Sequence, residues 1–382
     1  MMFLKKAFTT YLAEQAAKDG SKILAFADSN DISLQAASIL KKKKIAIPVI
    51  VGDSTKLLAS FKKLGLALTK DNISDPNLNK EQFDSFVKEY SASMKRDKKA
   101  NAEDEAREIL SKPVAYAMFL LEKDLVHGVI AGSIPESKPL RLAYERIGLA
   151  PGVGKASGLV ILSDKASGRV LFFADVAFIP SPVPDELSEI AELSYKTAAG
   201  LGIVPKVAFL SFSTNGAAKH ALVDNTRAAY EIFSAANPSI TAYGEIQADC
   251  ALDPDASKAK VPDSPLKGDA NVLIFPDLNS GNISYKLLEK LTSFESLGPI
   301  FLGLNKPVAD VSKAVTAEEI VSVAAVTALQ ANICKDYANA KTMKRVKPDA
   351  KKYHPMELIP TNVRKIIEEA RSAAKKDKQK DD

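Results

Sequence analysis

The sequence contains only two cysteines and three histidines in 382 residues, and it has no long apolar run. Cys250 and Cys334 are too few for a disulfide framework or a metal cluster, so we expect a reduced, cytoplasmic protein. No uncharged apolar stretch approaches the roughly 18 residues of a membrane-spanning helix. The amphipathic N-terminus also does not resemble a secretory signal. The 46% of apolar residues suffices for one large or two ordinary globular domains.

Several motifs of catalysis and cofactor binding are also missing. The three histidines form no H-E-x-x-H motif or zinc-ligand spacing, and we expect no metal site. Neither a G-x-S-x-G elbow nor a G-x-G-x-x-G fingerprint after a strand is present. PGVGKASG (151–158) is no phosphate-binding P-loop, because Leu149 and Ala156 replace the required glycine and the magnesium-binding hydroxyl.

The net charge of +5 is unevenly distributed along the chain. Residues 341–382 hold 13 Lys and Arg against 7 Asp and Glu, which leaves 39 against 40 in the rest. A balanced body does not favour nucleic-acid binding, which uses a concentrated basic face. The tail includes a predicted helix at 361–376. It could bind RNA, an acidic protein or a membrane surface, but its mixed charges favour a solvated helix.

The first third of the chain alternates strand-like and helix-like segments, which predicts parallel strands with crossover helices. The strands are expected at 22–27, 46–51 and 126–132. The helices are expected at 31–43, from an N-cap at Ser54, and as a pair within 101–123 that is broken at Pro113.

The pattern changes after APGVG (150–154), where a hairpin is expected from strands 158–163 and 170–174. The next predicted elements are a helix at 184–200, a strand at 206–210, a helix near 218–236, a strand at 270–275, a helix at 284–292 and a strand at 299–302. A long helix at 316–332 follows the Pro- and Gly-containing segment 303–310. We therefore predict domain boundaries near 155 and 305.

The segment FLSFSTNGAAKH (209–220) combines a strand end, hydroxyl groups, a glycine turn and a helix start. Ser211, Ser213, Thr214 and the backbone N–H groups after Gly216 could bind an anion at a helix N-terminus. The simpler alternative is a hydroxyl-capped turn between a strand and a helix. PDLNSGNISYK (276–286) allows the same two interpretations, with Tyr285 and Lys286 at the helix start.

A third segment, NKPVADVSKAVTAEEI (305–320), places a hydroxyl, a cation and a carboxylate within eight residues. Acyl transfer to a thiol needs these groups: Glu319 would take the thiol proton, Lys313 would bind phosphate, and Ser312 would support the oxyanion. The spacing alone favours a simpler interpretation, a T-x-x-E capping box formed by Thr316 and Glu319.

Taken together, these segments resemble the phosphate acetyltransferase family over roughly residues 90–332. The resemblance is carried by AREIL (106–110), VIAG (129–132), APGV (150–153), FFADVAFIPSP (172–182), VAFLSFSTNGAAKH (207–220), GEIQADCAL (244–252), ANVLIFPDLNSGNISYK (270–286), LGPIFLGLNKPVADVSK (297–313) and IVSVAAVTALQ (320–330).

The resemblance implies two α/β/α domains, the second inserted into the first, with the active site in the cleft between them. The first domain would comprise residues 1–154 and 305–340 and the second residues 155–304, with 341–382 as a tail. It implies reversible acetyl transfer between coenzyme A and phosphate by direct thiolate attack in a ternary complex. The partners would be coenzyme A, acetyl phosphate and inorganic phosphate. The resemblance also implies a homodimer with neither a metal nor a bound cofactor.

The resemblance also assigns site residues by position. Ser312 matches the serine of a D-L-S-R-G motif, and Arg141 and Arg96 match arginines that bind substrate or coenzyme. The residues that match segments on the phosphate side of the cleft are Ser211, Ser213, Thr214, Gly216, Asn282, Tyr285 and Lys286.

Several positions depart from the family pattern. Lys313 replaces an arginine and Glu319 an aspartate; Asn215 replaces a lysine, and FADSND and SIPESKP differ from the usual loops. Lysine loses the planar grip of arginine on phosphate. The added methylene of glutamate moves its carboxylate in a geometry where ~1 Å can cost on the order of 10²-fold in rate. Three alternatives stay open: a working acetyltransferase, a phosphate butyryltransferase-like enzyme, and a homologue that binds ligand without turnover.

Overall fold

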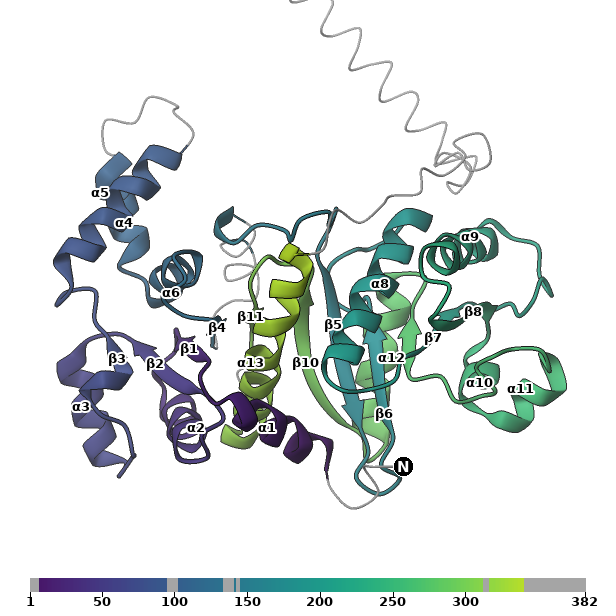
Figure 1. Cartoon of the computed structure of the whole chain (residues 1–382), viewed down its shortest axis with the longest axis horizontal. Coiled ribbons are helices and arrows are strands. Elements are labelled where there is room, and N and C mark those ends of the chain that lie inside the picture. Colours follow the sequence, from purple (N-terminus) through teal and green to yellow (C-terminus); the bar gives the residue numbers. More distant parts are fainter. Residues whose placement is uncertain (1–6, 95–101, 133–140, 142–144, 312–315, 340–382) are drawn as a thin grey trace, which may run out of the picture.

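The computed structural model describes residues 7–94, 102–132, 141, 145–311 and 316–339, the last five by their backbone only. Helices lie on both sides of one eleven-stranded sheet (Figure 1). The mixed α/β fold class predicted from the sequence is confirmed.

The described residues before residue 150 form six α-helices, one 3-10 helix and four strands. They are α1 (Phe8–Asp19), β1 (Ile23–Phe26), α2 (Asp31–Lys42), β2 (Ile47–Val51), α3 (Ser54–Lys63), η1 (Lys70–Asn72), β3 (Ile73–Ser74), α4 (Lys80–Ser93), α5 (Ala102–Leu110), α6 (Pro113–Glu122) and β4 (Gly128–Ile130).

The remaining elements follow after residue 155. They are β5 (Ser157–Ser163), β6 (Val170–Ala174), α8 (Pro184–Gly200), β7 (Lys206–Leu210), α9 (Ala221–Ala236), β8 (Thr241–Ile246), α10 (Ala248–Leu252), α11 (Pro254–Lys260), β9 (Val272–Ile274), α12 (Leu278–Leu291), β10 (Glu295–Leu302), β11 (Val308–Ala309) and α13 (Ala317–Asn339).

The sheet has the strand order β3-β2-β1-β4-β11-β10-β5-β6-β9-β7-β8. The first five strands in this order run parallel to one another. Strand β10 is antiparallel to both β11 and β5, and β5 is antiparallel to β6. The last four strands, β6, β9, β7 and β8, again run parallel to one another. These four strands therefore point in the direction opposite to the first five.

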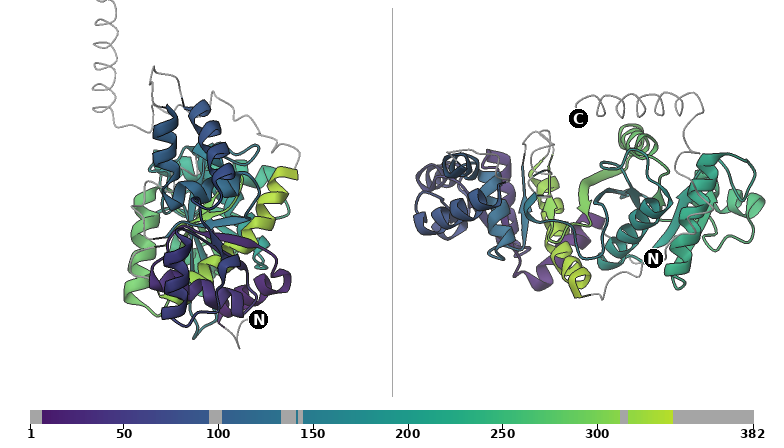
Figure 2. Two further views of the ribbon diagram at one scale, coloured as in Figure 1. Left: turned by 90° about the vertical axis from the view of Figure 1, so that its left-hand side faces the viewer. Right: turned by 90° about the horizontal axis from the view of Figure 1, so that it is seen from above.

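Helices cover both faces of the sheet (Figure 2). They bury apolar side chains against each face. The largest core cluster joins α1, α2, α3, α8, α9 and α13 to one face. The other face is covered by α4, α5 and α6 at one end and by α10 and α12 at the other. The expected crossover helices on both faces are thus present.

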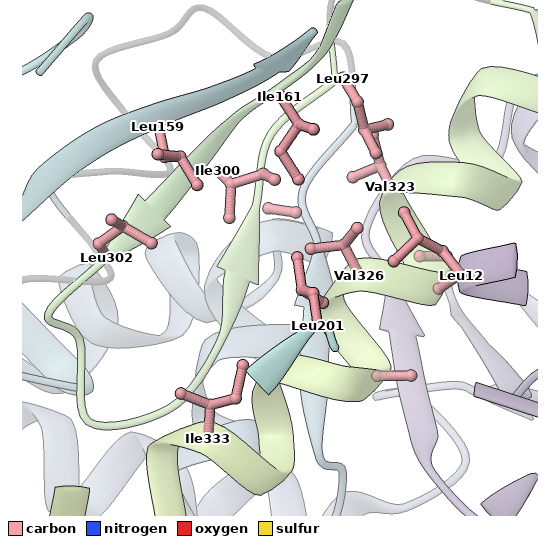
Figure 3. Close-up of a cluster of buried hydrophobic side chains, with 14 of the residues drawn as sticks. Leu12, Leu159, Ile161, Leu201, Leu297, Ile300, Leu302, Val323, Val326 and Ile333 are labelled. Atoms are coloured by element: carbon pink, nitrogen blue, oxygen red, sulfur yellow. The ribbon is translucent and has the colours of Figure 1, made fainter. Parts of the chain in front are cut away.

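Helix α13 fills the middle of the larger core (Figure 3). Its Val323 and Val326 lie near Leu12 of α1 and near Leu297 and Ile300 of β10. Burying a side chain of this size contributes roughly 1.5–3 kcal/mol. The segment after residue 305 therefore packs against α1, near the start of the chain, and against β10, which directly precedes it.

The strand order divides at the contact between β11 and β10, with residues 157–302 forming all strands on one side. The prediction of an inserted domain at 155–304 corresponds to this division, and it stays a prediction. The expected tail at 341–382 and its helix at 361–376 lie outside the described residues. Among the described helices, none is long and apolar enough to cross a membrane.

Candidate active site

The carboxyl ends of β1, β4 and β11 meet at one edge of the sheet. The Ala27 N–H donates to the carbonyl of Ile130 at 3.0 Å, and the Ala131 N–H donates to the carbonyl of Ala309 at 2.8 Å. From β1 the chain continues to β2 on one side, whereas β4 and β11 lie on the other. Such a switch point is where open α/β sheets bind ligands.

Close backbone packing shapes this edge. Gly132 follows β4 with φ of +81°, and a Cβ at this position would overlap the Cβ of Asp28 after β1. Asp28 also accepts hydrogen bonds from the backbone and side-chain amide of Asn30, at 3.0 and 2.7 Å. Asn30 in turn accepts the Ser33 N–H at the start of α2. Sequence reasoning did not select Asp28 or Gly132 as site residues, although both lie in segments that it quoted.

Helix α13 begins just beyond this edge and carries the predicted base, Glu319. Its Oε2 accepts the Thr316 N–H at 2.6 Å and the Thr316 hydroxyl at 3.1 Å, while Thr316 Oγ1 accepts the Glu319 N–H at 3.2 Å. The capping box predicted as the simpler interpretation is therefore present. Ser312 and Lys313 lie outside the described residues.

Arg141 is the predicted anion-binding arginine that the structure describes. Its side chain is 81% exposed, and its Nε donates to Oε1 of Glu145 at 2.7 Å. Exposed ion pairs of this kind contribute little to stability. Arg96 lies outside the described residues.

The loop after β7 is organised around the carboxylate of Glu245 on β8. Glu245 is buried, and its Oε1 accepts the Ser213 hydroxyl at 2.9 Å and the Gly216 N–H at 2.8 Å. The Ser213 hydroxyl accepts the Ala218 N–H at 3.0 Å. In this conformation, the predicted anion cradle thus holds the protein's own carboxylate.

Glu245 is also paired with Arg227 of α9, whose Nε donates to its Oε2 at 2.9 Å. Burial by itself would raise the pKa of Glu245. The hydrogen bonds from Arg227, Gly216 and Ser213 outweigh burial and hold this pKa below its usual value. The local sequence YGEI contains no signal for this role, because the partners of Glu245 come from two distant segments.

The other residues of the SFSTNG segment have structural contacts as well. The Thr214 hydroxyl accepts the Gln247 N–H at 2.9 Å, and Ser211 Oγ accepts the Ser213 N–H at 3.2 Å. Helix α9 starts at Ala221 with His220 as its N-cap. The helix start predicted near residue 218 was therefore too early, and Gly216 does not lie at a helix N-terminus.

Residues Asn282, Tyr285 and Lys286 lie on helix α12 rather than in a loop. This helix begins at Leu278, with Asp277 accepting the Ser280 N–H at 2.9 Å, so the predicted start at 284 was six residues too late. Asn282 donates to the carbonyl of Val176 at 3.0 Å. Tyr285 is buried, and the Lys286 amine lies 5.1 Å from the centre of its ring.

Asp175, directly after β6, is a buried carboxylate that sequence reasoning did not select. Its two oxygens accept four backbone N–H groups, from Gly158, Ala177, Phe178 and Ile179, at 2.7–3.2 Å. Burial nevertheless dominates and raises the pKa of Asp175. This carboxylate fixes the turn against which α12 packs, because a Cβ on Gly281 would overlap the Asp175 carbonyl.

The predicted site residues thus form two groups. Glu319 lies on α13, which follows β11, and Arg141 follows β4 in the sequence and pairs with Glu145, whereas the contacts of Ser213, Gly216 and Asn282 stay within the part around β6–β9. Strands β4 and β11 run in the direction opposite to strands β6–β9. No group of three or more His, Cys, Asp or Glu suited to a metal occurs among the described residues.

A family model described as phosphate acetyl/butaryl transferase matches residues 7–328. The chain belongs to this family. The phosphate acetyltransferase of Thermoanaerobacterium thermosaccharolyticum is 36% identical over 326 residues, which cover 84% of this chain and 98% of that protein. The phosphate acetyltransferase of Bacillus subtilis is 36% identical over 325 residues, with 85% and 98% covered.

A longer relative in the family, the phosphate acetyltransferase of Nitratidesulfovibrio vulgaris, is 34% identical over 327 residues; the match spans 85% of this chain but 46% of that protein. Solved structures agree with the family assignment. A phosphotransacetylase from Streptococcus pyogenes has a TM-score of 0.78 and 34% identity, with 85% of this chain and 98% of that chain covered. EutD phosphotransacetylase from Staphylococcus aureus has a TM-score of 0.76 and 29% identity with the same coverage.

Proposed function

We propose that this chain is a phosphate acetyltransferase, which transfers an acetyl group reversibly between coenzyme A and phosphate. The observation that carries the proposal is the match to phosphate acetyltransferases at 36% identity over almost their whole length. The substrates are coenzyme A and acetyl phosphate in one direction, and acetyl-CoA and inorganic phosphate in the other. The proposal needs no metal ion or bound cofactor.

The proposed reaction is one direct displacement in a ternary complex. Glu319 removes the proton from the thiol of coenzyme A, and the thiolate attacks the carbonyl carbon of acetyl phosphate. The new C–S bond forms as the C–O bond to phosphate breaks, and phosphate leaves with the electron pair of that bond. Ser312 donates a hydrogen bond to the carbonyl oxygen as its negative charge develops, and Lys313 neutralises the phosphate.

The capping role of Glu319 is compatible with this chemistry. Thr316 uses only Oε2, and within the described part of the chain Oε1 has no hydrogen-bond partner. That second oxygen is the one that would accept the thiol proton. The bonds to Oε2 would hold the carboxylate in one orientation, which is a requirement for efficient proton transfer.

The arginines are proposed to bind the phosphate groups of coenzyme A. A guanidinium presents a planar set of donors that matches phosphate geometry, and Arg141 is exposed enough to exchange Glu145 for a ligand. Arg96 is assigned the same task from its sequence position. We assign the second part of the chain, with Asn282 and Lys286, to the wall of the cleft that faces the acyl phosphate.

The test is a measurement of free thiol during incubation of the purified protein with acetyl phosphate and coenzyme A. Loss of thiol, with acetyl-CoA as the product, is the expected result. A parallel reaction with butyryl phosphate separates the two acyl substrates, because each methylene changes discrimination by about 1–3 kcal/mol. Faster reaction with butyryl phosphate would change the assigned acyl substrate from acetyl phosphate to butyryl phosphate. No reaction with either compound would overturn the proposal.

We also propose that the enzyme is cytoplasmic, in line with its low cysteine content, and that it is a homodimer, because α12 presents apolar side chains to solvent. Ile283, Leu287 and Leu291 lie four residues apart, and they are 55%, 53% and 78% exposed. Residues at this spacing share one helix face, and exposed apolar stripes are typical of protein interfaces. Light scattering after chromatography should give twice the chain mass of 41.0 kDa. The Leu287→Glu variant should elute as a monomer, and a wild-type monomer would contradict the proposal.

A further inference from the structure

Arg146 is a buried arginine that no step of the proposed reaction uses. Only 8% of its side chain is exposed. Its Nε and Nη2 both donate to Oε2 of Glu122 on α6, at 2.8 and 2.5 Å. Nη2 also lies 3.5 Å from Oε1 of Glu89, and Nη1 lies 3.3 Å from the hydroxyl of Ser93, both on α4. A single side chain therefore connects the segment around residue 146 to two helices.

Two aromatic rings complete the environment of Arg146. The centre of its guanidinium lies 4.0 Å from the Phe119 ring centroid and 5.4 Å from that of Tyr90. The two rings contact each other edge to face at 5.5 Å. Cation–π contacts are stronger when the cation is desolvated, as it is here. Arg146 is thus fixed by ring stacking as well as by hydrogen bonds.

Arg141 lies five residues before this fixed point. It is highly exposed, and its partner Glu145 directly precedes Arg146. Charges on this segment also act on Tyr90: burial raises the pKa of Tyr90, the Glu145 carboxylate adds to the rise, and Arg146 and Arg141 oppose it. The buried and the exposed arginine therefore lie around the same tyrosine.

We propose that Arg146 is a positioning residue, which holds the backbone at Glu145 and Arg146 against α4 and α6 and thereby limits where Arg141 presents its guanidinium to the phosphate groups of coenzyme A. The inference rests on the proposed function, because that function supplies the ligand of Arg141. Arg146 itself does not touch the ligand: its charge is already matched by Glu122 and Glu89. Its contribution is to reduce the conformational freedom that Arg141 would lose on binding.

Stability alone does not explain an arginine at this position. A buried ion pair is often no more stable than apolar residues of similar volume. The guanidinium, however, can stack on two rings and bond to three residues at once, which no aliphatic side chain can do. The consequence of losing it should therefore appear in ligand affinity as well as in thermal stability.

The test is a double-mutant cycle on the full chain, with the dissociation constant of coenzyme A measured by titration calorimetry. Arg146→Met keeps an unbranched side chain over Phe119 and removes the polar contacts. We expect Arg146→Met and Arg141→Ala each to weaken binding about tenfold, which corresponds to about 1.4 kcal/mol. The double variant should be no weaker than Arg141→Ala alone, because Arg146 acts through Arg141.

Arg107 provides a matched control on the neighbouring helix α5. Its guanidinium lies 5.5 Å from the Phe83 ring centroid, and its Nη1 lies 2.8 Å from Oδ1 of Asp84. Arg107→Met should leave coenzyme A affinity unchanged, because this half-exposed pair shares no contact with Arg146. Arg146→Lys should restore part of the affinity, because it keeps the charge and one bond to Glu122.

Affinity losses that add in the double variant would overturn the inference, and so would an Arg146→Met variant with wild-type affinity. Titration calorimetry measures coenzyme A binding whether or not the protein turns its substrates over. A wild-type protein that binds coenzyme A without catalysis would overturn the proposed function and leave this inference open to the same cycle. A wild-type protein that binds no coenzyme A would overturn both.

Discussion

The two roles of Glu319 can be separated by substitution, because capping and proton transfer use different properties of the side chain. In the wild type, the Thr316 N–H donates to Oε2 of Glu319 at 2.6 Å. Glu319→Gln keeps a carbonyl oxygen that can accept this hydrogen bond. It loses only the favourable interaction of a negative charge with the helix N-terminus, about 0.5 kcal/mol. Turnover should fall by a factor on the order of 10²–10⁴, since an amide cannot accept the thiol proton.

Thr316→Ala has the opposite profile and serves as the control. The Thr316 hydroxyl accepts the Glu319 N–H at 3.2 Å, and its removal should cost about 1 kcal/mol of unfolding free energy. The carboxylate remains, so turnover should fall less than about tenfold. Thermal unfolding and initial rates of thiol loss measure the two effects on the same samples, with coenzyme A affinity as a check on binding.

The base assignment would be refuted if Glu319→Gln kept wild-type turnover. Equal losses of turnover in Glu319→Gln and Thr316→Ala would assign the effect to the helix cap. A large fall in turnover in Glu319→Gln with normal coenzyme A affinity would support a role in the transition state, since ground-state binding is then unchanged.

Three further predictions follow from the geometry and the charges. Lys313→Arg should lower the KM for acetyl phosphate in steady-state kinetics, because arginine binds phosphate through two parallel hydrogen bonds. An unchanged or higher KM would argue against a phosphate contact at position 313. Gly132→Ala should destabilise the protein by about 2 kcal/mol or more in urea unfolding, because its Cβ would overlap Asp28. Gly65→Ala should cost about 1 kcal/mol, because Gly65 also has a positive φ but no neighbour within 4 Å. Equal losses in the two variants would show that packing at the strand edge is unimportant. The pKa of Glu245 is held below its usual value of 4.5, so the stabilisation by its ionised form is present above pH 4.5 and is lost as the pH falls through the folded-state pKa. The loss of stability in Arg227→Met should therefore shrink below pH 4.5, and a pH-independent difference would contradict the pairing.

The elements predicted best are those whose apolar pattern is bounded by turn residues. The predicted bounds of 170–174, 206–210 and 184–200 agree with β6, β7 and α8. These strands are buried on both faces and therefore form continuous apolar runs. Pro184 and Asp185 mark the start of α8 in the same local way.

Two of the strands that were missed, β8 and β11, depend on distant partners. Strand β8 contains Gly244 and Glu245, which weaken the strand pattern, and Glu245 is buried only because a loop and a helix supply its partners. Strand β11 is two residues long and exists through pairing with β4 and β10. Neither feature has a local sequence signal.

The same limit applies to the site. The capping box at Thr316 was predicted because it is formed within four residues. Arg146 was not selected, because its burial depends on Phe119 and Tyr90, which come from two other helices. The local sequence around Gly216 predicted a site that binds an anion, but it could not show that this anion is the Glu245 carboxylate of β8.

The central claim is tested most directly in the direction that consumes phosphate. Wild-type protein is incubated with acetyl-CoA and inorganic phosphate, and acetyl phosphate is followed by phosphorus NMR while free thiol is measured. The account predicts that acetyl phosphate and coenzyme A appear in equal amounts, and only when both substrates are present. Release of thiol without acetyl phosphate would indicate hydrolysis, and no release of thiol at all would contradict the assignment of this chain as a phosphate acetyltransferase.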